Sequence, residues 1–115
     1  MAKKLRGQTT RIMYVELKSD SNERGPAWIG RVTFSKTGRT IYYRDLILKS
    51  LKGRGIYANY RDENTGLEYW VSAPKKNGED RHPLGSGAIK IDEDIADEYW
   101  RTIRQCGPPK NPFVT

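Results

Sequence analysis

Apolar and polar residues alternate with a period of two along much of the chain, which is typical of strands with one buried face. In residues 11–18, for example, Met13, Val15 and Leu17 share one face. The same pattern, bounded by turn residues, predicts strands over residues 11–18, 27–35, 40–44, 56–61, 67–73 and 88–91. Residues 45–49 are a short apolar run, which periodicity leaves open between a strand and a turn of helix.

The spacing of apolar residues becomes helical over residues 92–104. The predicted apolar stripe consists of Ile95, Ala96, Tyr99, Trp100 and Ile103. Asp92 is the expected N-cap, and Gly107 followed by two prolines is expected to end the helix. Residues 108–115 are expected to form a loosely attached tail.

This order of elements predicts a mainly β (α+β) fold in one domain. We expect a small antiparallel curled sheet or barrel of about six or seven strands with one C-terminal helix. The helix would bury its stripe on the sheet or across a barrel mouth. The domain is expected to span residues 11–107, after a basic N-terminal extension at residues 1–10.

Positive charge is concentrated in the first half of the chain. The net charge of the 115 residues is +7, yet residues 1–61 hold 14 Lys and Arg against 4 Asp and Glu. This asymmetry favours an anionic partner for the first half. The alternative is that these cations only improve solubility and protect sheet edges from pairing.

Several features predict a cytoplasmic protein. No apolar run approaches the roughly 20 residues of a membrane span, so no membrane association is expected. The first ten residues are basic and polar, unlike a secretory signal. Cys106 is the sole cysteine, so an internal disulfide is excluded.

The residues that carry catalysis in other proteins are scarce in this chain. A Ser-His-Asp system would need His82, the only histidine, and no nucleophile-elbow pattern is present. One His and one Cys do not make a zinc site. Gly85-Ser86-Gly87 leads into a predicted strand rather than a helix, unlike a nucleotide-binding loop. No catalytic site, metal or cofactor is therefore predicted, and a small enzyme remains only as a second alternative function.

Residues 74–87 form a long predicted loop that contains Lys75, Lys76, Arg81 and His82. Loops of this length without structure of their own are often functional, so the loop is a candidate for ligand binding. The alternative is a stiff connection, held by Pro74 and Pro83, whose charges are only solvated.

Several aromatic and basic residues lie on faces of the predicted strands. Tyr57 and Arg61 share one strand face, Trp70 lies on the partner strand, and Tyr42 with Arg44 forms a further pair. Such a surface resembles the stacking platforms that bind single-stranded nucleic acids. The alternative is that Trp70 and Tyr57 lie under the C-terminal helix.

Three runs of sequence resemble a family of small uncharacterised bacterial proteins. They are WIGRVTFSKTGRTIYYRD at 28–45, GLEYWVSAPKKNGEDRH at 66–82 and IDEDIADEYWRTIR at 91–104. Members sometimes carry an automatic label as 1-deoxy-D-xylulose-5-phosphate synthase. That enzyme needs a thiamine diphosphate site and several large domains, which 115 residues cannot house. The resemblance therefore implies a shared fold but no activity.

The predicted function is a non-enzymatic binding module for nucleic acid or another polyanion. The alternative is a protein-interaction module, such as an immunity or accessory protein. The candidate anion-binding residues are Lys36, Arg39, Tyr42, Arg44, Arg54, Tyr57, Arg61, Trp70, Lys75, Lys76, Arg81 and His82.

Overall fold

The structure is a computed structural model that describes residues 9–18, 26–53, 58–80 and 88–115. Of the candidate residues, Arg54, Tyr57, Arg81 and His82 lie outside these ranges, as does the Gly85-Ser86-Gly87 run. Within them, no helix is both long and apolar enough to cross a membrane.

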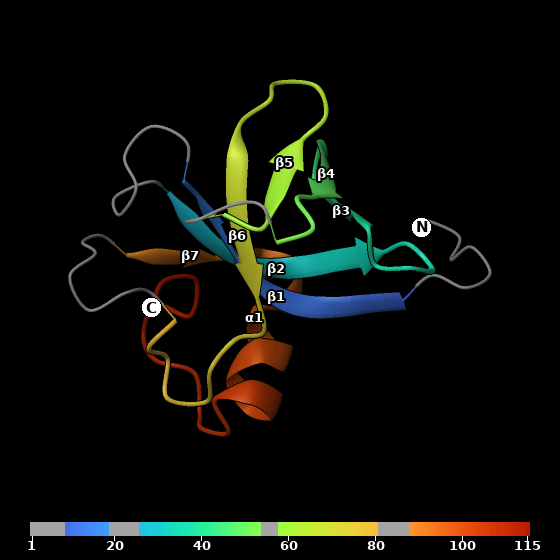
Figure 1. The fold of residues 1–115 in the computed structure, drawn as a ribbon. Coiled ribbons are helices and arrows are strands. Elements are labelled where there is room, and N and C mark those ends of the chain that lie inside the picture. Colours follow the sequence, from blue (N-terminus) through green and yellow to red (C-terminus); the bar gives the residue numbers. More distant parts are fainter. Residues whose placement is uncertain (1–8, 19–25, 54–57, 81–87) are drawn as a thin grey trace.

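A closed six-stranded antiparallel barrel with one outer strand forms the core of the described chain (Figure 1). The strands are β1 (Thr9–Leu17), β2 (Ala27–Phe34), β3 (Thr40–Tyr43), β4 (Leu46–Ser50), β5 (Tyr60–Asp62), β6 (Glu68–Ser72) and β7 (Ile89–Ile91). Their order is β1-β6-β5-β4-β3-β2-β7, and pairing of β1 with β2 closes the barrel. The predicted mainly β fold is confirmed, and the short apolar run at residues 45–49 forms strand β4 from Leu46 onward rather than a helical turn.

Both faces of β1 and β2 carry buried residues, and the alternation along each strand decides which of two hydrophobic clusters a side chain joins. Met13, Val15 and Val32 point into the barrel, where they pack with residues of β3, β4 and β6. Residues of the opposite face, such as Tyr14 and Ile29, pack against β7 and the C-terminal helical segment. These two strands therefore separate two hydrophobic clusters, whereas β3 to β6 bury mainly one face.

The predicted helix is a short helical run with changing geometry. It comprises a 3₁₀ turn η1 (Glu93–Ile95), one α-turn α1 (Ala96–Glu98) and a π-turn η2 (Tyr99–Ile103). The predicted stripe is confirmed, because all five of its residues belong to the cluster on β1 and β2. The N-cap prediction is correct for the backbone position of Asp92 but wrong for its side chain, which makes no capping hydrogen bond.

The tail is firmly attached, so its predicted looseness is wrong. The backbones of Ile89 and Thr115 exchange two hydrogen bonds, of 3.0 and 2.9 Å, and Ile91 N–H donates to the Phe113 carbonyl at 2.8 Å. Trp100 Nε1–H donates to the Pro112 carbonyl at 2.7 Å. The tail thus pairs with β7 and fastens the helical run to the sheet.

Candidate functional site

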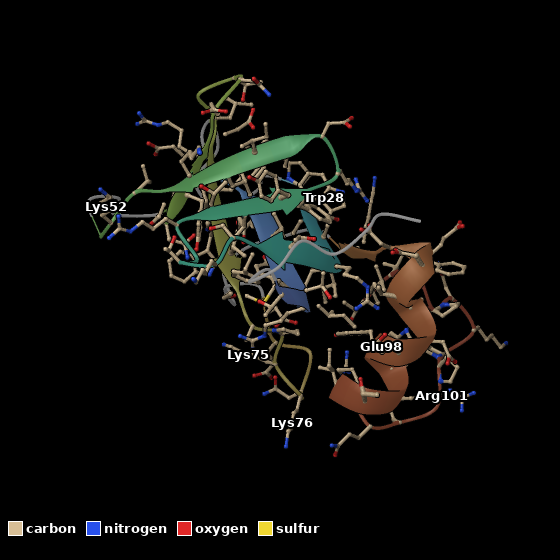
Figure 2. The ribbon with its side chains drawn as sticks, turned by 90° about the vertical axis from the view of Figure 1, so that its right-hand side faces the viewer. Trp28, Lys52, Lys75, Lys76, Glu98 and Arg101 are labelled. Atoms are coloured by element: carbon tan, nitrogen blue, oxygen red, sulfur yellow. The ribbon has the colours of Figure 1, made fainter. Side chains whose placement is uncertain are left out.

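Two turns bring cations together at one end of the barrel. The β2–β3 turn carries Lys36 and Arg39, and the turn after β4 carries Lys52. Ser50 N–H donates to the Arg39 carbonyl at 2.8 Å, which fixes the two turns side by side. In Figure 2, Lys52 lies at the end of the barrel away from the helix. We call Lys36, Arg39 and Lys52 the basic barrel end.

All three side chains of the basic barrel end are exposed. None of them forms an ion pair within the described part of the chain. Lys52 itself adopts φ 54°, a left-handed conformation that is uncommon for a residue with a side chain. Sequence reasoning missed Lys52 because only strand register shows that it joins the two predicted cations.

The outer wall of β3 to β6 carries three other candidate residues. Tyr42 on β3 is 40% exposed and Trp70 on β6 is 39% exposed. The helical run packs on β1, β2 and β7, so the alternative that Trp70 lies beneath it is wrong. Arg61 on β5 is exposed and pairs with Glu68 at 2.8 Å.

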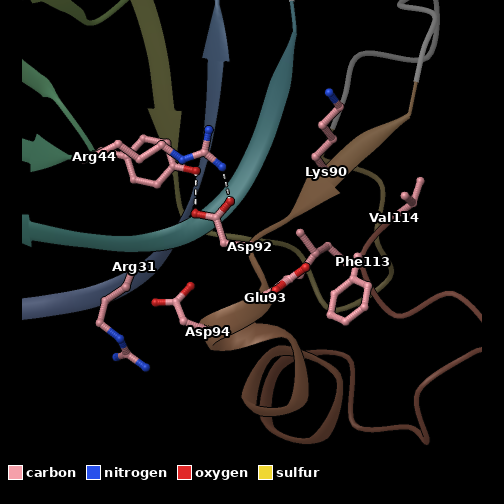
Figure 3. A pocket seen from close by; sticks show the side chains of 10 residues that line it. Arg31, Arg44, Lys90, Asp92, Glu93, Asp94, Phe113 and Val114 are labelled. Carbon is pink, nitrogen blue, oxygen red and sulfur yellow. Dashed lines mark hydrogen bonds and ion pairs between the residues drawn. The ribbon is translucent and has the colours of Figure 1, made fainter.

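Arg44 is separated from Tyr42 and turned toward the barrel end near β7 (Figure 3). Its guanidinium pairs with Asp92 and lies 5.5 Å from the ring centroid of Trp28 and 5.1 Å from that of Tyr43. Burial alone would lower the pKa of Arg44, but the hydrogen bond to Asp92 and nearby charges raise it. Arg44 also adopts φ 54° in the two-residue turn after β3.

Tyr43 completes this network by donating its hydroxyl to Asp92 Oδ2 at 2.7 Å. Burial and then the bond to Asp92 raise the pKa of Tyr43, so the phenol stays protonated as a donor. The side chains of Tyr43 and Asp92 approach the backbone of Gly30 on β2, where an added Cβ would overlap both of them. The network therefore requires glycine at position 30 and joins the helix start to the barrel.

An open pocket of about 700 Å³ lies beside this network. It is lined by Arg31, Tyr43, Arg44, Lys90, Ile91, Asp92, Glu93, Asp94, Phe113 and Val114. Three cations and three carboxylates balance in charge, and Arg31 also pairs with Glu98 at 2.7 Å. The pocket has no excess of either charge with which to select a polyanion.

The described half of the long loop, residues 74–80, is folded by its own hydrogen bonds. Lys75 N–H donates to Asp80 Oδ1 at 2.6 Å, and Gly78 N–H donates to the Lys75 carbonyl at 3.1 Å. Burial raises the pKa of Asp80, although the bond from Lys75 opposes this. The Arg104 guanidinium packs on Gly78 and ties the loop to the helix end.

Lys75 and Lys76 remain exposed on this folded loop (Figure 2). Neither forms an ion pair within the described residues. The hydrogen bonds within residues 74–80 therefore agree with a stiff connection. They also leave the side chains of Lys75 and Lys76 accessible to a ligand. Both interpretations of the loop remain predictions for Arg81 and His82.

Of the residues considered for catalysis, His82 lies outside the described residues. Cys106 is exposed after the helical run. No group of three or more His, Cys, Asp or Glu side chains within residues 9–18, 26–53, 58–80 and 88–115 could hold a metal ion.

Comparisons with protein-family models, curated proteins and solved structures found no match. The resemblance to a family of small bacterial proteins therefore remains a prediction. Functional inference for this chain rests on the geometry of its own surface.

Proposed function

We propose that this chain is a non-enzymatic binding module for a polyanion, with nucleic acid as the first candidate. The basic barrel end would contact phosphates. The observation that carries the proposal is the backbone bond from Ser50 to Arg39, which places Lys52 beside the predicted pair Lys36 and Arg39. Their three charges lack ion-pair partners within the described residues, unlike Arg44 and Arg61.

Cations without an ion-pair partner suit a polyanion site best. A cation that contacts a phosphate releases condensed counterions, and this release drives binding that weakens as salt rises. A cation already paired with a carboxylate has to exchange that partner and contributes less. Unpaired cations on two adjacent turns therefore support phosphate binding better than the charge-balanced pocket does.

A protein partner is the second candidate, and the acidic start of the helical run favours it. Glu93 and Asp94 are exposed and form no ion pair within the described residues. A basic protein could recognise this side instead of the barrel end. Binding that persists at high salt and is unchanged by substitution of the barrel-end cations would favour a protein partner.

The test compares two triple variants with the same change in net charge. Lys36→Ala/Arg39→Ala/Lys52→Ala removes the basic barrel end. Lys90→Ala/Arg101→Ala/Lys110→Ala removes three exposed cations from β7, the helical run and the tail. Fluorescence anisotropy with labelled single-stranded and duplex oligonucleotides, over a range of salt, gives the slope of log K against log salt.

For a single strand, the barrel-end variant should flatten this slope by about two units, roughly 0.7 for each phosphate that is no longer neutralised. The control variant should leave the slope nearly unchanged. The proposal would be contradicted if the parent bound no polyanion at low salt, or if the two variants flattened the slope equally.

A further inference from the structure

A continuous line of exposed side chains crosses the outer wall from β3 to β6. Tyr42 lies opposite Ile47, so Lys49, two residues further along β4, is its diagonal neighbour. Lys49 lies directly opposite Arg61 on β5. Side chains of this wall therefore follow one another across neighbouring strands.

The line ends on a second aromatic ring. Arg61 lies opposite Glu68, so Trp70, two residues further along β6, is its diagonal neighbour. Diagonal pairs on a sheet remain within reach of aromatic and long side chains. We call Tyr42, Lys49, Arg61 and Trp70 the outer stripe, in which two cations lie between two aromatic rings.

The alternation along each strand directs the outer stripe away from the barrel interior. Tyr43, Leu48 and Tyr69, which neighbour its members in sequence, are buried in the barrel core. Both rings of the stripe are about two-fifths exposed. Within the described residues, Phe113 on the tail is the other large apolar side chain of similar exposure, at 41%.

The cations of the outer stripe have acidic neighbours, but these ion pairs are weak. Arg61 meets Glu68 at 2.8 Å and Lys49 meets Glu63 at 3.9 Å. Both cationic side chains are at least half exposed, at 55% and 50%. Exposed pairs of this kind contribute little to stability, so a phosphate can replace the carboxylate at little cost.

The outer stripe also adjoins the basic barrel end. Lys49 pairs in register with Thr40, the residue after Arg39. A chain of phosphates that leaves the barrel end can therefore continue across the wall between the two rings. Three strand spacings of about 4.8 Å place β3 and β6 roughly 14 Å apart along the sheet, which is room for several nucleotides.

We infer that the outer stripe binds single-stranded nucleic acid, with unpaired bases stacked on Trp70 and Tyr42 and phosphates held by Lys49 and Arg61. This inference rests on the proposed function, because it names the form of polyanion that the module takes. Stacking requires a free base face, which a duplex keeps inside its helix. Exposed rings on a convex wall therefore select single strands over duplexes.

The test uses fluorescein-labelled single-stranded DNA of about 16 nucleotides, RNA of the same sequence, and the DNA duplex, a length within the range of known single-strand sites. Trp70→Ala should weaken binding of single strands by roughly 5- to 100-fold, the effect of removing one stacked base. Tyr42→Ala should act in the same direction. Trp70→Phe keeps a ring and should restore most of the affinity.

Phe113→Ala is the matched control, since it removes an equally exposed ring from the tail. It should leave affinity unchanged. Thermal melts of all variants identify any loss of folding. Equal effects on DNA and RNA would assign recognition to bases and phosphates, whereas a preference for RNA would add a contact to the 2′-hydroxyl.

The outcomes separate the two proposals. If single strands bind with the salt dependence of the barrel end but Trp70→Ala and Tyr42→Ala bind as the parent does, the inference about the outer stripe is wrong and the proposed function stands. A duplex that binds more tightly than the single strand would also overturn the inference. Absence of binding to all three probes would overturn both.

Discussion

The two sides of the barrel differ in how far their aromatic side chains are buried. On the side of β1, β2 and β7, the helical run and the tail cover the sheet, and Tyr99 and Trp100 are 0% and 5% exposed. On the side of β3 to β6, no element among the described residues covers the outer face, and Tyr42 and Trp70 are 40% and 39% exposed. Aromatic residues from one small domain therefore divide into a structural set and an exposed set.

This difference predicts that folding stability depends mainly on the covered side and that the proposed binding depends on the open side. Burying a large side chain contributes about 1.5–3 kcal/mol, so the covered side supplies much of the folding free energy. The open side gains less stability from its rings, because Tyr42 and Trp70 are 40% and 39% exposed. Substitutions on the two sides should therefore separate stability from binding.

The largest effect is expected from Trp100→Ala on the covered side. Removal of this buried ring, with its bond to Pro112, should lower the free energy of unfolding by about 3–5 kcal/mol. Urea unfolding followed by circular dichroism measures the change. Trp70→Ala is the matched control and should lower stability by less than Trp100→Ala does, because its ring is 39% exposed and that of Trp100 only 5%; equal changes would remove the distinction between the two sides.

Gly30→Ala should have the next largest effect, because the new Cβ would overlap Asp92 and lie 2.6 Å from Tyr43 Cε1. Overpacking of this kind costs about 1–3 kcal/mol. Gly107→Ala, where nothing lies within 4 Å, serves as the control and should change stability by less than about 0.5 kcal/mol. A Gly30 variant as stable as its control would show that the Tyr43–Asp92–Arg44 network is not tightly packed.

Asp62 provides an acid-sensitive anchor within β5. Burial would raise the pKa of Asp62, but bonds from Ile47 N–H and from the Thr65 hydroxyl and N–H outweigh burial and lower it. Because the pKa of Asp62 is lower in the folded than in the unfolded state, its full contribution to folding stability is present above the ordinary aspartate pKa. The contribution is lost as pH falls through the folded value.

Asp62→Asn should therefore destabilise the protein at pH 7 by about 1–3 kcal/mol, as bonds to a buried acceptor are weakened. The same substitution should matter less at about pH 3, below the ordinary aspartate pKa, where protonation of the unfolded state begins to remove this contribution. Urea unfolding of the parent and the variant at both pH values tests this prediction. The difference in unfolding free energy between the two proteins reports on Asp62 alone, because Asp80, whose pKa is raised, is present in both. A difference that does not depend on pH would contradict the assignment.

The smallest effect on folding is expected from Arg61→Ala in the outer stripe. The Arg61–Glu68 pair is exposed, so its removal should change stability by no more than about 1 kcal/mol. Glu68→Gln should have a similarly small effect on unfolding, yet it should strengthen binding of single strands by freeing Arg61. Anisotropy and urea unfolding of the two variants would show whether stability and binding separate as expected.

Local patterns predicted the parts of the fold that depend on spacing alone. The alternation around Met13 and Val15 identified a strand, and the helical spacing of Ile95, Tyr99 and Trp100 identified the face that packs on the sheet. Both patterns follow from the period of the backbone, which is two in strands and about 3.6 in helices. These local patterns do not predict contacts between segments that are distant in the sequence.

The errors and omissions all concern such distant contacts. Asp92 was assigned to a helix cap, but its side chain accepts hydrogen bonds from Tyr43 and Arg44, which precede it by 49 and 48 residues. The tail was expected to be loose, although its pairing with β7 depends on backbone groups that sequence does not reveal. Lys49 and Lys52 were overlooked because strand register alone brings them beside the predicted cations.

The most direct test of the account uses the indole N–H signals of the three tryptophans in a proton–nitrogen NMR spectrum. The protein is titrated with unlabelled single-stranded DNA, and each signal reports on one region. The Trp70 signal is expected to shift progressively, while that of Trp100, whose indole N–H is bonded to the Pro112 carbonyl on the covered side, is expected to stay in place. A shift of Trp100 with Trp70 unmoved, or no shift of any indole at excess DNA, would contradict the account.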